Sequence, residues 1–436
     1  MDSITPQIKE IILDFQGLTL ETGVPRHLEI TPIRGKATIC IGVRRSGKST
    51  MLYQIIDKLQ QNGVPKENIL YLNFFDERLH RLEEVGLGVI LEAYFSLYPE
   101  KKNAEKIYCF FDEIQIIEGW EPFVDRVIRM EKSEVYITGS SAKLLSKEIA
   151  TQMRGRSMSW EIFPFSFKEF LDYKEIDSRE PFSTKKRLLI QNAFEDYWEK
   201  GSFPEVVGLE KSLRIKVLQE YFNSVLYRDL IERHDIAHPK AVIDLARWLI
   251  DNNGSLYSIN NLTGYLKSLG HKISKSTVSD YLAWFEDAYF FFNVKIFDSS
   301  LARVHSNPKK IYCIDLAMVN AVSSGIMINS GRLLENLVFI ALRRMTTQIF
   351  YHKTQSGLEI DFIAQMHNRK RLLIQVCESL TDPKTKSREI SALNEAMLEL
   401  NIKSAMLVTR NQEGSIEVQA GRIDMIPAWR FLLEKI

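Results

Sequence analysis

One nine-residue segment, 42–50, most constrains what this chain can fold into, because its sequence GVRRSGKST fits the pattern G-x-x-x-x-G-K-[ST]. This pattern is typical of the phosphate-binding P-loop. The apolar run 37–41 precedes it and predicts a buried strand, and the segment 51–60 predicts a helix. A strand, this loop and a helix in that order are the context that the motif requires. The segment therefore predicts a nucleotide-binding α/β sheet.

The residue types of the loop suit a polyphosphate. Glycines allow backbone N–H groups to turn inward around the β-phosphate, and the helix that begins near Gly47 directs its positive end at the same charge. Lys48 is expected to reach the β- and γ-phosphates, and the Ser49 hydroxyl is expected to bind Mg²⁺. The predicted nucleotide-contacting residues are Gly42, Arg44, Arg45, Ser46, Gly47, Lys48, Ser49 and Thr50.

A second motif, which is acidic, follows the P-loop about sixty residues later, at the spacing of a P-loop core. The runs 68–75 and 106–111 predict two further strands, and the second of them ends in Asp112 and Glu113. An apolar strand that ends in Asp-Glu is the Walker B pattern. Asp112 is expected to hold Mg²⁺ through water, and Glu113 is expected to polarise the attacking water. We therefore predict ATP and Mg²⁺ as cofactors, and hydrolysis of ATP to ADP and phosphate.

Two further roles, each with a first and a second candidate residue, complete the predicted catalytic site. The strand 135–141 ends in small polar residues, of which Ser140 is the first candidate to sense the γ-phosphate and Ser141 the second; a plain turn is the alternative. Arginine at a subunit interface can stabilise transition-state charge in a neighbour's site. Arg156 is the candidate for this role and Arg154 is the second choice, with a structural salt bridge as the alternative.

The middle of the chain predicts helices and then a DNA-binding motif. The segments 167–173, 185–200 and 213–233 carry apolar residues at helical spacing, as in a helical lid and connector. Between 258 and 297 a helix, a turn, a second helix and a strand follow in the order of a winged helix-turn-helix. Winged helices also bind proteins. The predicted DNA contacts are Lys267, Lys272, Lys275, Ser276 and Thr277, and Arg303, His305, Lys309 and Lys310 extend this basic patch.

The last hundred residues resemble a metal-dependent nuclease with two changes. Glu335 on a helix and Asp361 on a strand are suited to bind Mg²⁺, and such a site also needs an acid and a lysine on the next strand. Here those positions hold Gln375 and Cys377, and cysteine cannot supply the cation. We therefore predict a retained fold without nuclease activity. An ATP-powered nuclease would need a cation from elsewhere in the chain.

Composition restricts the class of protein. The formal charge of +1 excludes a basic field over the whole surface, so that any DNA site must be local. The four cysteines are far apart in apolar stretches, which indicates buried thiols in a reducing cytoplasm. The first residues do not form a secretory signal, and no apolar run has the length of a membrane span. The sequence predicts a cytoplasmic protein without a membrane partner.

Several short blocks together resemble one family, the AAA-type P-loop ATPases of bacteria and archaea that carry a C-terminal domain of formerly unknown function. The resemblance covers nearly the whole chain and implies an AAA+ core, a winged helix and a restriction-endonuclease-like domain. Members of that family usually have Glu-Val-Lys where this chain has Gln375-Val376-Cys377. The blocks are GVRRSGKST, FDEIQ (111–115), ITGSS (137–141), RGR (154–156), PFSF (164–167), YRD (227–229), LEN (334–336) and EIDF (359–362).

The predicted fold is an AAA+ core with a parallel sheet and helical lid, then a winged helix, then a degenerate PD-(D/E)xK nuclease-like α/β domain. The predicted function is an ATP-hydrolysing protein that binds and remodels or translocates DNA, branched DNA included, as a homo-oligomeric ring with a hexamer favoured. The alternative is a nucleotide-controlled assembly switch that binds a protein partner. The expected segments are 1–165 (core), 166–252 (lid and connector), 253–312 (winged helix) and 313–436 (nuclease-like domain).

Overall fold

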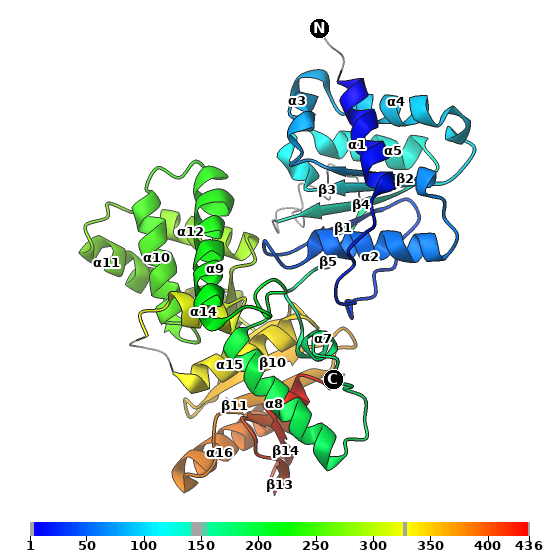
Figure 1. Ribbon diagram of the computed structural model, residues 1–436. Helices are drawn as coiled ribbons and strands as arrows, with labels where there is room; N and C mark the ends of the chain where they lie inside the picture. Colours follow the sequence, from blue (N-terminus) through cyan, green and yellow to red (C-terminus); the bar gives the residue numbers. More distant parts are fainter. Residues whose placement is uncertain (1–3, 141–150, 152, 154, 326–328, 435–436) are drawn as a thin grey trace. The chain divides into compact units, whose positions relative to one another are not determined.

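The computed structural model describes residues 4–140, 151, 153, 155–325 and 329–434 (Figure 1). The chain forms two compact units, residues 1–163 and 164–436. The first unit ends two residues before the end of segment 1–165, which was expected to form the core. The three segments expected after residue 165 all belong to the second unit.

The first unit contains a five-stranded sheet with the order β2-β3-β4-β1-β5, in which all neighbours are parallel. This confirms the parallel α/β sheet predicted around the P-loop. Its helices and strands are α1 (Thr5–Gly17), β1 (Ala37–Ile41), α2 (Lys48–Gln61), β2 (Ile69–Asn73), α3 (Leu82–Val85), α4 (Gly88–Leu97), β3 (Ile107–Asp112), α5 (Trp120–Met130), β4 (Ser133–Gly139) and β5 (Ser157–Glu161).

Helices cover both faces of this sheet. Successive residues of a strand point to opposite faces, and Phe110 and Phe111 on β3 show this directly. Phe110 joins a buried cluster with Phe15 of α1 and Leu52 of α2. Phe111 contacts Phe123 of α5, with ring centroids 5.6 Å apart. Figure 1 shows α2 and α5 on opposite sides of the sheet. The strand order also places the carboxyl ends of β3, β4 and β1 side by side, where ligands of parallel sheets bind.

The second unit is built on a nine-stranded mixed sheet with the order β13-β14-β12-β11-β10-β9-β7-β8-β6. A short π-helix, Val225–Glu232, follows α9. The helices and strands are α7 (Phe167–Tyr173), α8 (Thr184–Lys200), α9 (Lys211–Ser224), α10 (Pro239–Asp251), β6 (Leu256–Tyr257), α11 (Ile259–Ser268), α12 (Lys275–Asp287), β7 (Phe291–Ile296), α13 (Leu301–Ser306), β8 (Lys309–Cys313), α14 (Leu316–Val322), α15 (Ser330–Arg343), β9 (Ile349–Lys353), β10 (Glu359–Gln365), β11 (Arg371–Cys377), α16 (Pro383–Leu400), β12 (Ser404–Thr409), β13 (Gly414–Val418), β14 (Gly421–Pro427) and α17 (Ala428–Phe431).

The helices and strand expected between 258 and 297 are present as α11, α12 and β7. β7 pairs with β8 in the antiparallel sense and with β9 in the parallel sense. The strands next to α12 therefore share one sheet with the predicted nuclease-like segment, and the boundary expected between 312 and 313 falls inside β8. None of the helices that the structure describes is both long enough and apolar enough to cross a membrane.

Candidate functional site

Two glycines of the P-loop occupy positions that other residues cannot adopt without strain. A Cβ atom added at Gly42 would lie 2.1 Å from the carbonyl oxygen of Ile162, a backbone atom that follows β5. Gly47 has a φ of +94° and immediately precedes α2. Left-handed backbone and close backbone approach both favour glycine. The motif spacing thus follows from how β1 turns into α2 beside β5.

Lys48 and Glu113, predicted for one site, lie close together. The Nζ atom of Lys48 donates hydrogen bonds of 3.2 Å to the carbonyl oxygens of Gly42 and Val43. It lies 3.7 Å from Oε1 of Glu113, and both side chains are largely buried. A lysine held by the loop and next to the Walker B carboxylate is placed to meet the outer phosphates of a nucleotide.

Asp112 is fully buried and surrounded by hydroxyl groups. Tyr71 donates to its Oδ2 at 2.8 Å, Thr138 donates to its Oδ1, and Ser49 is a third hydrogen-bond partner. Burial raises the pKa of Asp112, and Glu113 adds to this, although the hydrogen bonds from Thr138, Ser49 and Tyr71 oppose the shift. The structure therefore brings together Asp112 and Ser49, an oxygen donor pair of the kind that binds Mg²⁺. Mg²⁺ bound there would neutralise phosphate charge.

Glu113 has a left-handed backbone, with a φ of +59°. Its N–H group donates to Thr138 Oγ1 at 2.9 Å, and its Oε2 accepts from the Nε2 of Gln115 at 2.5 Å. Tyr71, Thr138 and Gln115 were not predicted as site residues. The available signal was a polar group within, or just after, a buried strand: Tyr71 on β2, Thr138 on β4 and Gln115 after β3.

The other predicted residues of the nucleotide site have varied surroundings. Ser46 and Ser140 are buried, and Ser140 directly follows β4 at the carboxyl edge of the sheet. Thr50 is half-buried at the start of α2, and Arg45 is exposed. The Arg44 guanidinium lies 6.0 Å from the centre of the Phe75 ring. Ser141 and Arg154 lie outside the described residues.

Arg26 is a further contact of the P-loop that the sequence did not indicate. Its guanidinium donates to the carbonyl oxygen of Ser46 at 3.2 Å and to that of Phe163. The segment before β1 is fixed to α2 as well, because Gln54 donates to the carbonyl oxygens of Thr22 and Val24, both at 2.7 Å. This segment therefore borders the loop.

Arg156 is placed away from the nucleotide site of its own chain. It precedes β5, and its carbonyl oxygen accepts from the N–H group of Ala37 at the start of β1, whereas the P-loop follows the other end of β1. The guanidinium pairs with Asp125 at 2.7 Å, and Asp125 also pairs with Arg129 at 2.8 Å. Burial raises the pKa of Asp125, but the two arginines lower it further, below its ordinary value. Action on a neighbour's nucleotide stays a prediction.

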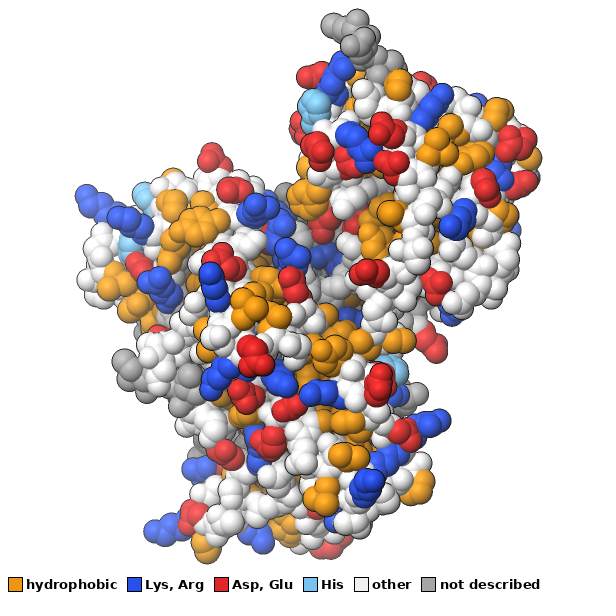
Figure 2. Space-filling model, viewed as in Figure 1, with side chains coloured by type: hydrophobic (Ala, Val, Ile, Leu, Met, Phe, Trp, Pro, Cys, Tyr) orange, Lys and Arg blue, Asp and Glu red, His pale blue; other side chains and the backbone are white. Residues whose placement is uncertain are grey.

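The N-terminal end of α12 presents most of the predicted DNA contacts to solvent. Lys267, Lys272, Lys275 and Ser276 are exposed, and Thr277 is half-buried. Ser274 caps the helix, because its Oγ accepts from the N–H group of Thr277 at 3.1 Å. The three lysines make no ion pair with any residue that the structure describes. Figure 2 shows Lys and Arg side chains on the outer edge of the region formed by α10, α11 and α12.

The prediction that Lys310 belongs to this basic patch is wrong. Lys310 is only 2% exposed, because alternation along β8 turns its side chain into the second unit. Lys309 is half-buried, and burial and the neighbouring Lys295 lower its pKa. Arg303 pairs with Asp298 at 3.1 Å. Arg303 and His305 are exposed on α13, and the exposed lysines of the patch that make no ion pair with a described residue lie on and between α11 and α12.

Lys310 lies instead among three carboxylates, Glu335, Glu359 and Asp361, which we call the acid cluster. Its Nζ atom is 2.8 Å from an oxygen of Glu335 and 2.9 Å from an oxygen of each of the other two. Tyr312 also donates a hydrogen bond to Glu335. Mg²⁺ binds oxygen at the shorter distance of about 2.0–2.1 Å. Glu335 and Asp361, the two acids predicted for a metal ion, thus contact an ammonium group.

Gln375 and Cys377 supply no replacement for the missing nuclease groups. The Gln375 side chain accepts from the N–H group of Asp361 at 3.1 Å and donates to Glu389 at 2.7 Å. Cys377 is half-buried, burial raises the pKa of its thiol, and its Sγ donates to the carbonyl oxygen of Ser379. A neutral thiol cannot orient a water molecule as a lysine would.

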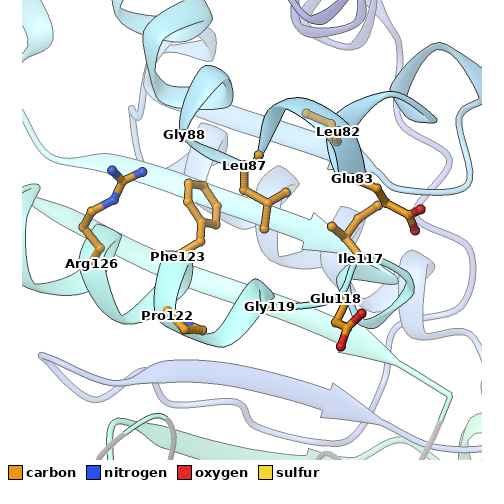
Figure 3. A pocket seen from close by; sticks show the side chains of 11 residues that line it. Leu82, Glu83, Leu87, Gly88, Ile117, Glu118, Gly119, Pro122, Phe123 and Arg126 are labelled. Atoms are coloured by element: carbon orange, nitrogen blue, oxygen red, sulfur yellow. The ribbon is translucent and has the colours of Figure 1, made fainter.

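A separate pocket of about 350 Å³ lies in the first unit (Figure 3). Its lining includes no residue of the P-loop and neither Asp112 nor Glu113, so we do not assign this pocket to the nucleotide site. It is lined by Leu82, Glu83, Gly86, Leu87, Gly88, Ile117, Glu118, Gly119, Pro122, Phe123 and Arg126.

Three family models match successive parts of the chain. Residues 34–171 match an AAA domain, residues 191–329 match a domain of unknown function (DUF8612), and residues 330–431 match another (DUF4143). An uncharacterized protein of Methanocaldococcus jannaschii is 35% identical over 98% of this chain and 95% of its own length. An uncharacterized protein of Haemophilus influenzae is 34% identical over 74% of this chain and 78% of its own length.

Solved structures show weaker similarity. The Aeropyrum pernix ORC1 protein in complex with DNA is 14% identical, with a TM-score of 0.32 over 74% of this chain and 92% of that one. CDC6P from Pyrobaculum aerophilum is 10% identical, with a TM-score of 0.25 over 69% of this chain and 88% of that one. Both scores are too low to carry an argument.

Proposed function

Because this chain belongs to the same family as the Methanocaldococcus jannaschii and Haemophilus influenzae proteins, and its residues 34–171 are an AAA domain, we propose that it is an ATPase acting on DNA. It hydrolyses ATP with Mg²⁺ and remodels or translocates DNA, branched DNA included, as an oligomeric ring. The observation that carries the ATPase part is the convergence of Lys48, Ser49, Asp112 and Glu113 at one edge of the sheet.

The chemistry of this site is mainly positioning and charge stabilisation, as in other phosphoryl transfers. The P-loop binds the phosphates, and Lys48 exchanges its bonds to the loop carbonyls for the outer phosphate oxygens. Ser49 and Asp112 would hold Mg²⁺. Glu113 orients the attacking water and takes its proton. Thr138 fixes both acidic residues, because its hydroxyl bonds to the Asp112 carboxylate and to the Glu113 N–H group.

The proposal that the protein binds DNA rests on two exposed lysines at the start of α12, Lys272 and Lys275. It also rests on the helix N-terminus between them, which Ser274 caps. Side chains at the N-terminal end of a recognition helix contact base edges, and lysines and helix N-termini contact phosphates. ATPase rates measured with single-stranded DNA, duplex DNA and a four-way junction test this part. Stimulation by at least one of them is expected. Failure of all three to bind or to stimulate would contradict it.

Charge reversal at Lys272 and Lys275 is expected to weaken DNA binding and to reduce the slope of log affinity against log salt by about 2, one for each lost phosphate contact. Fluorescence anisotropy of labelled DNA at several salt concentrations measures both quantities. The matched control reverses Lys384 and Lys386, two exposed lysines of α16. If the control weakens binding as much as the α12 variant does, the assignment of the surface is wrong.

A nucleotide-controlled switch that binds protein is the second candidate function. It is favoured by two exposed hydrophobic side chains in the same segment, Leu269 after α11 (49% exposed) and Leu301 on α13 (75% exposed). Exposed apolar side chains that form one contiguous patch mark protein contact sites, and Leu269 and Leu301 are the candidates for such a patch here. If the protein is such a switch, charge reversal at Lys272 and Lys275 is expected to leave any affinity for DNA nearly unchanged.

Arg156→Ala is expected to lower ATP hydrolysis about 10-fold or more if Arg156 stabilises the transition state of a neighbouring subunit. A mixture of Arg156→Ala chains with Lys48→Ala chains then regains activity, because one partner supplies the P-loop and the other the arginine. Steady-state phosphate release from the mixed and separate proteins measures this. No recovery on mixing, together with an equal loss of activity in Asp125→Ala, would leave Arg156 as part of a structural ion pair.

A further inference from the structure

Gln115 lies next to Glu113 in a way that the proposed reaction can use. Its Nε2 donates to Glu113 Oε2 at 2.5 Å. Its Oε1 is buried and accepts no hydrogen bond from any described residue. From these contacts, and resting on the proposed ATPase function, we propose that Gln115 positions Glu113 and accepts a hydrogen bond from the attacking water.

The local structure holds the Gln115 carboxamide in place. Gln115 is the middle residue of a single 3₁₀ turn, Ile114–Ile116, that follows Glu113. The Ile114 side chain is fully buried and anchors this turn to the core. The backbone of Glu113 is fixed in turn by Thr138. The direction of the Glu113 carboxylate is then set by its side-chain partners, Gln115 and Lys48.

Only one of these two partners remains when nucleotide binds. Lys48 is 3.7 Å from Glu113 and is expected to move its charge to the phosphates. The hydrogen bond from Gln115 then keeps Glu113 oriented.

The Oε1 atom of Gln115 needs a donor. A buried carbonyl oxygen without a hydrogen bond is unfavourable, so such groups are seldom left without a donor. A water molecule held between Gln115 Oε1 and the Glu113 carboxylate would supply both hydrogen bonds. Its oxygen would have its lone pair directed away from both acceptors, toward an incoming γ-phosphate.

The reaction balances with these groups in place. The water oxygen forms a bond to the γ-phosphorus, and one of its protons passes to the Glu113 carboxylate. The bond between the γ-phosphorus and the bridging oxygen breaks, and its electron pair stays on ADP. Gln115 accepts a hydrogen bond from the second water hydrogen and exchanges no proton, so that it acts as a positioning residue.

Three variants of the full chain test this role. Gln115→Ala is expected to lower kcat about 10- to 100-fold through loss of orientation, with KM and the affinity for ADP unchanged. Gln115→Glu places a second carboxylate beside Glu113, so the pair retains a proton to higher pH. The acid limb of its pH–rate profile should therefore move to higher pH. Glu118→Gln, an exposed carboxylate nearby in the chain, is the control and should behave as the wild type.

The outcomes separate this inference from the proposed function. If the wild type hydrolyses ATP and Gln115→Ala keeps its kcat, the role of Gln115 is wrong and the ATPase function stands. The role is also wrong if Gln115→Ala lowers kcat and nucleotide affinity together while the pH profile of Gln115→Glu does not move, because this describes a structural residue. If the wild type hydrolyses no ATP under any condition, the proposed function fails and this inference fails with it.

Discussion

Glu113→Gln is expected to slow ATP hydrolysis by about 10²- to 10⁴-fold while leaving ATP affinity near its wild-type value. The substituted amide keeps the size of the side chain and its contact with Gln115, but it cannot take a proton from water. Single-turnover hydrolysis and equilibrium binding of a fluorescent ATP analogue measure the two effects separately.

A comparison with Lys48→Ala sharpens this result. Lys48 contacts the loop itself, and its ammonium is the group expected on the outer phosphates. Its loss should reduce nucleotide affinity as well as hydrolysis. A Glu113→Gln protein that hydrolyses ATP at the wild-type rate would show that Glu113 is not the base, and would direct attention to another acid at the carboxyl edge of the sheet.

Lys310→Met is expected to lower the free energy of unfolding of the second unit by about 3–5 kcal/mol, the cost of leaving buried charges without their partner. Among the described residues, only Lys310 forms ion pairs with all three acids of the cluster. Burial by itself lowers the pKa of the Lys310 ammonium. The nearby groups raise this pKa well above its ordinary value, and they are Asp361, Glu335, Tyr312 and Glu359. Denaturant unfolding, with hydrogen exchange at β8 and β10, measures the loss and locates it.

The loss in Lys310→Met should depend on pH. Burial and Asp361 raise the pKa of Glu335 to about 7 even though Lys310 opposes the shift, and the ordinary value is 4.5. A carboxyl group with a raised pKa in the folded state favours folding at low pH, and this stability is lost as pH rises from about 4.5 to 7. Removal of Lys310 removes the opposing charge. The free energy of unfolding of the variant should therefore be closer to the wild-type value at pH 5 than at pH 8.

Two further variants serve as controls for this prediction. Lys384→Met removes an exposed lysine of α16 and should change stability by less than about 0.5 kcal/mol. Adding Glu335→Gln and Asp361→Asn to Lys310→Met removes two of the stranded charges and should restore part of the stability. Equal stability of Lys310→Met and the wild type at pH 8 would contradict the view that the acid cluster needs an internal cation.

The parts of the nucleotide site that lie close together in sequence could be predicted. The P-loop is one continuous segment, and Asp112 and Glu113 end an apolar strand, so pattern and spacing were enough. Tyr71 could not be found in this way. It is 41 residues from Asp112, and its contact depends on β2 lying beside β3 in the sheet. Strand order is set by the packing of the whole unit, which no local pattern reports.

Lys310 shows the same limit for charge. Counted along the sequence, it belongs to a run of basic residues after the predicted wing. The alternation of β8 directs Lys310 inward, and the acids that receive it come from α15 and β10. A lysine is seldom buried without partners, but those partners become visible only when three distant segments are assembled. The absence of a lysine at position 377, in contrast, was evident from the sequence alone.

The parallel pairing of β7 with β9 has a practical consequence for dissecting this protein. A chain ended at residue 312 would lose the last residue of β8 and would leave β7 without β9, as an edge strand paired only with β8. Exposed strand edges of this kind pair with other chains and aggregate. The lysines of α12 are therefore best studied on a fragment that retains the whole nine-stranded sheet, and a shorter piece would report on its own self-association.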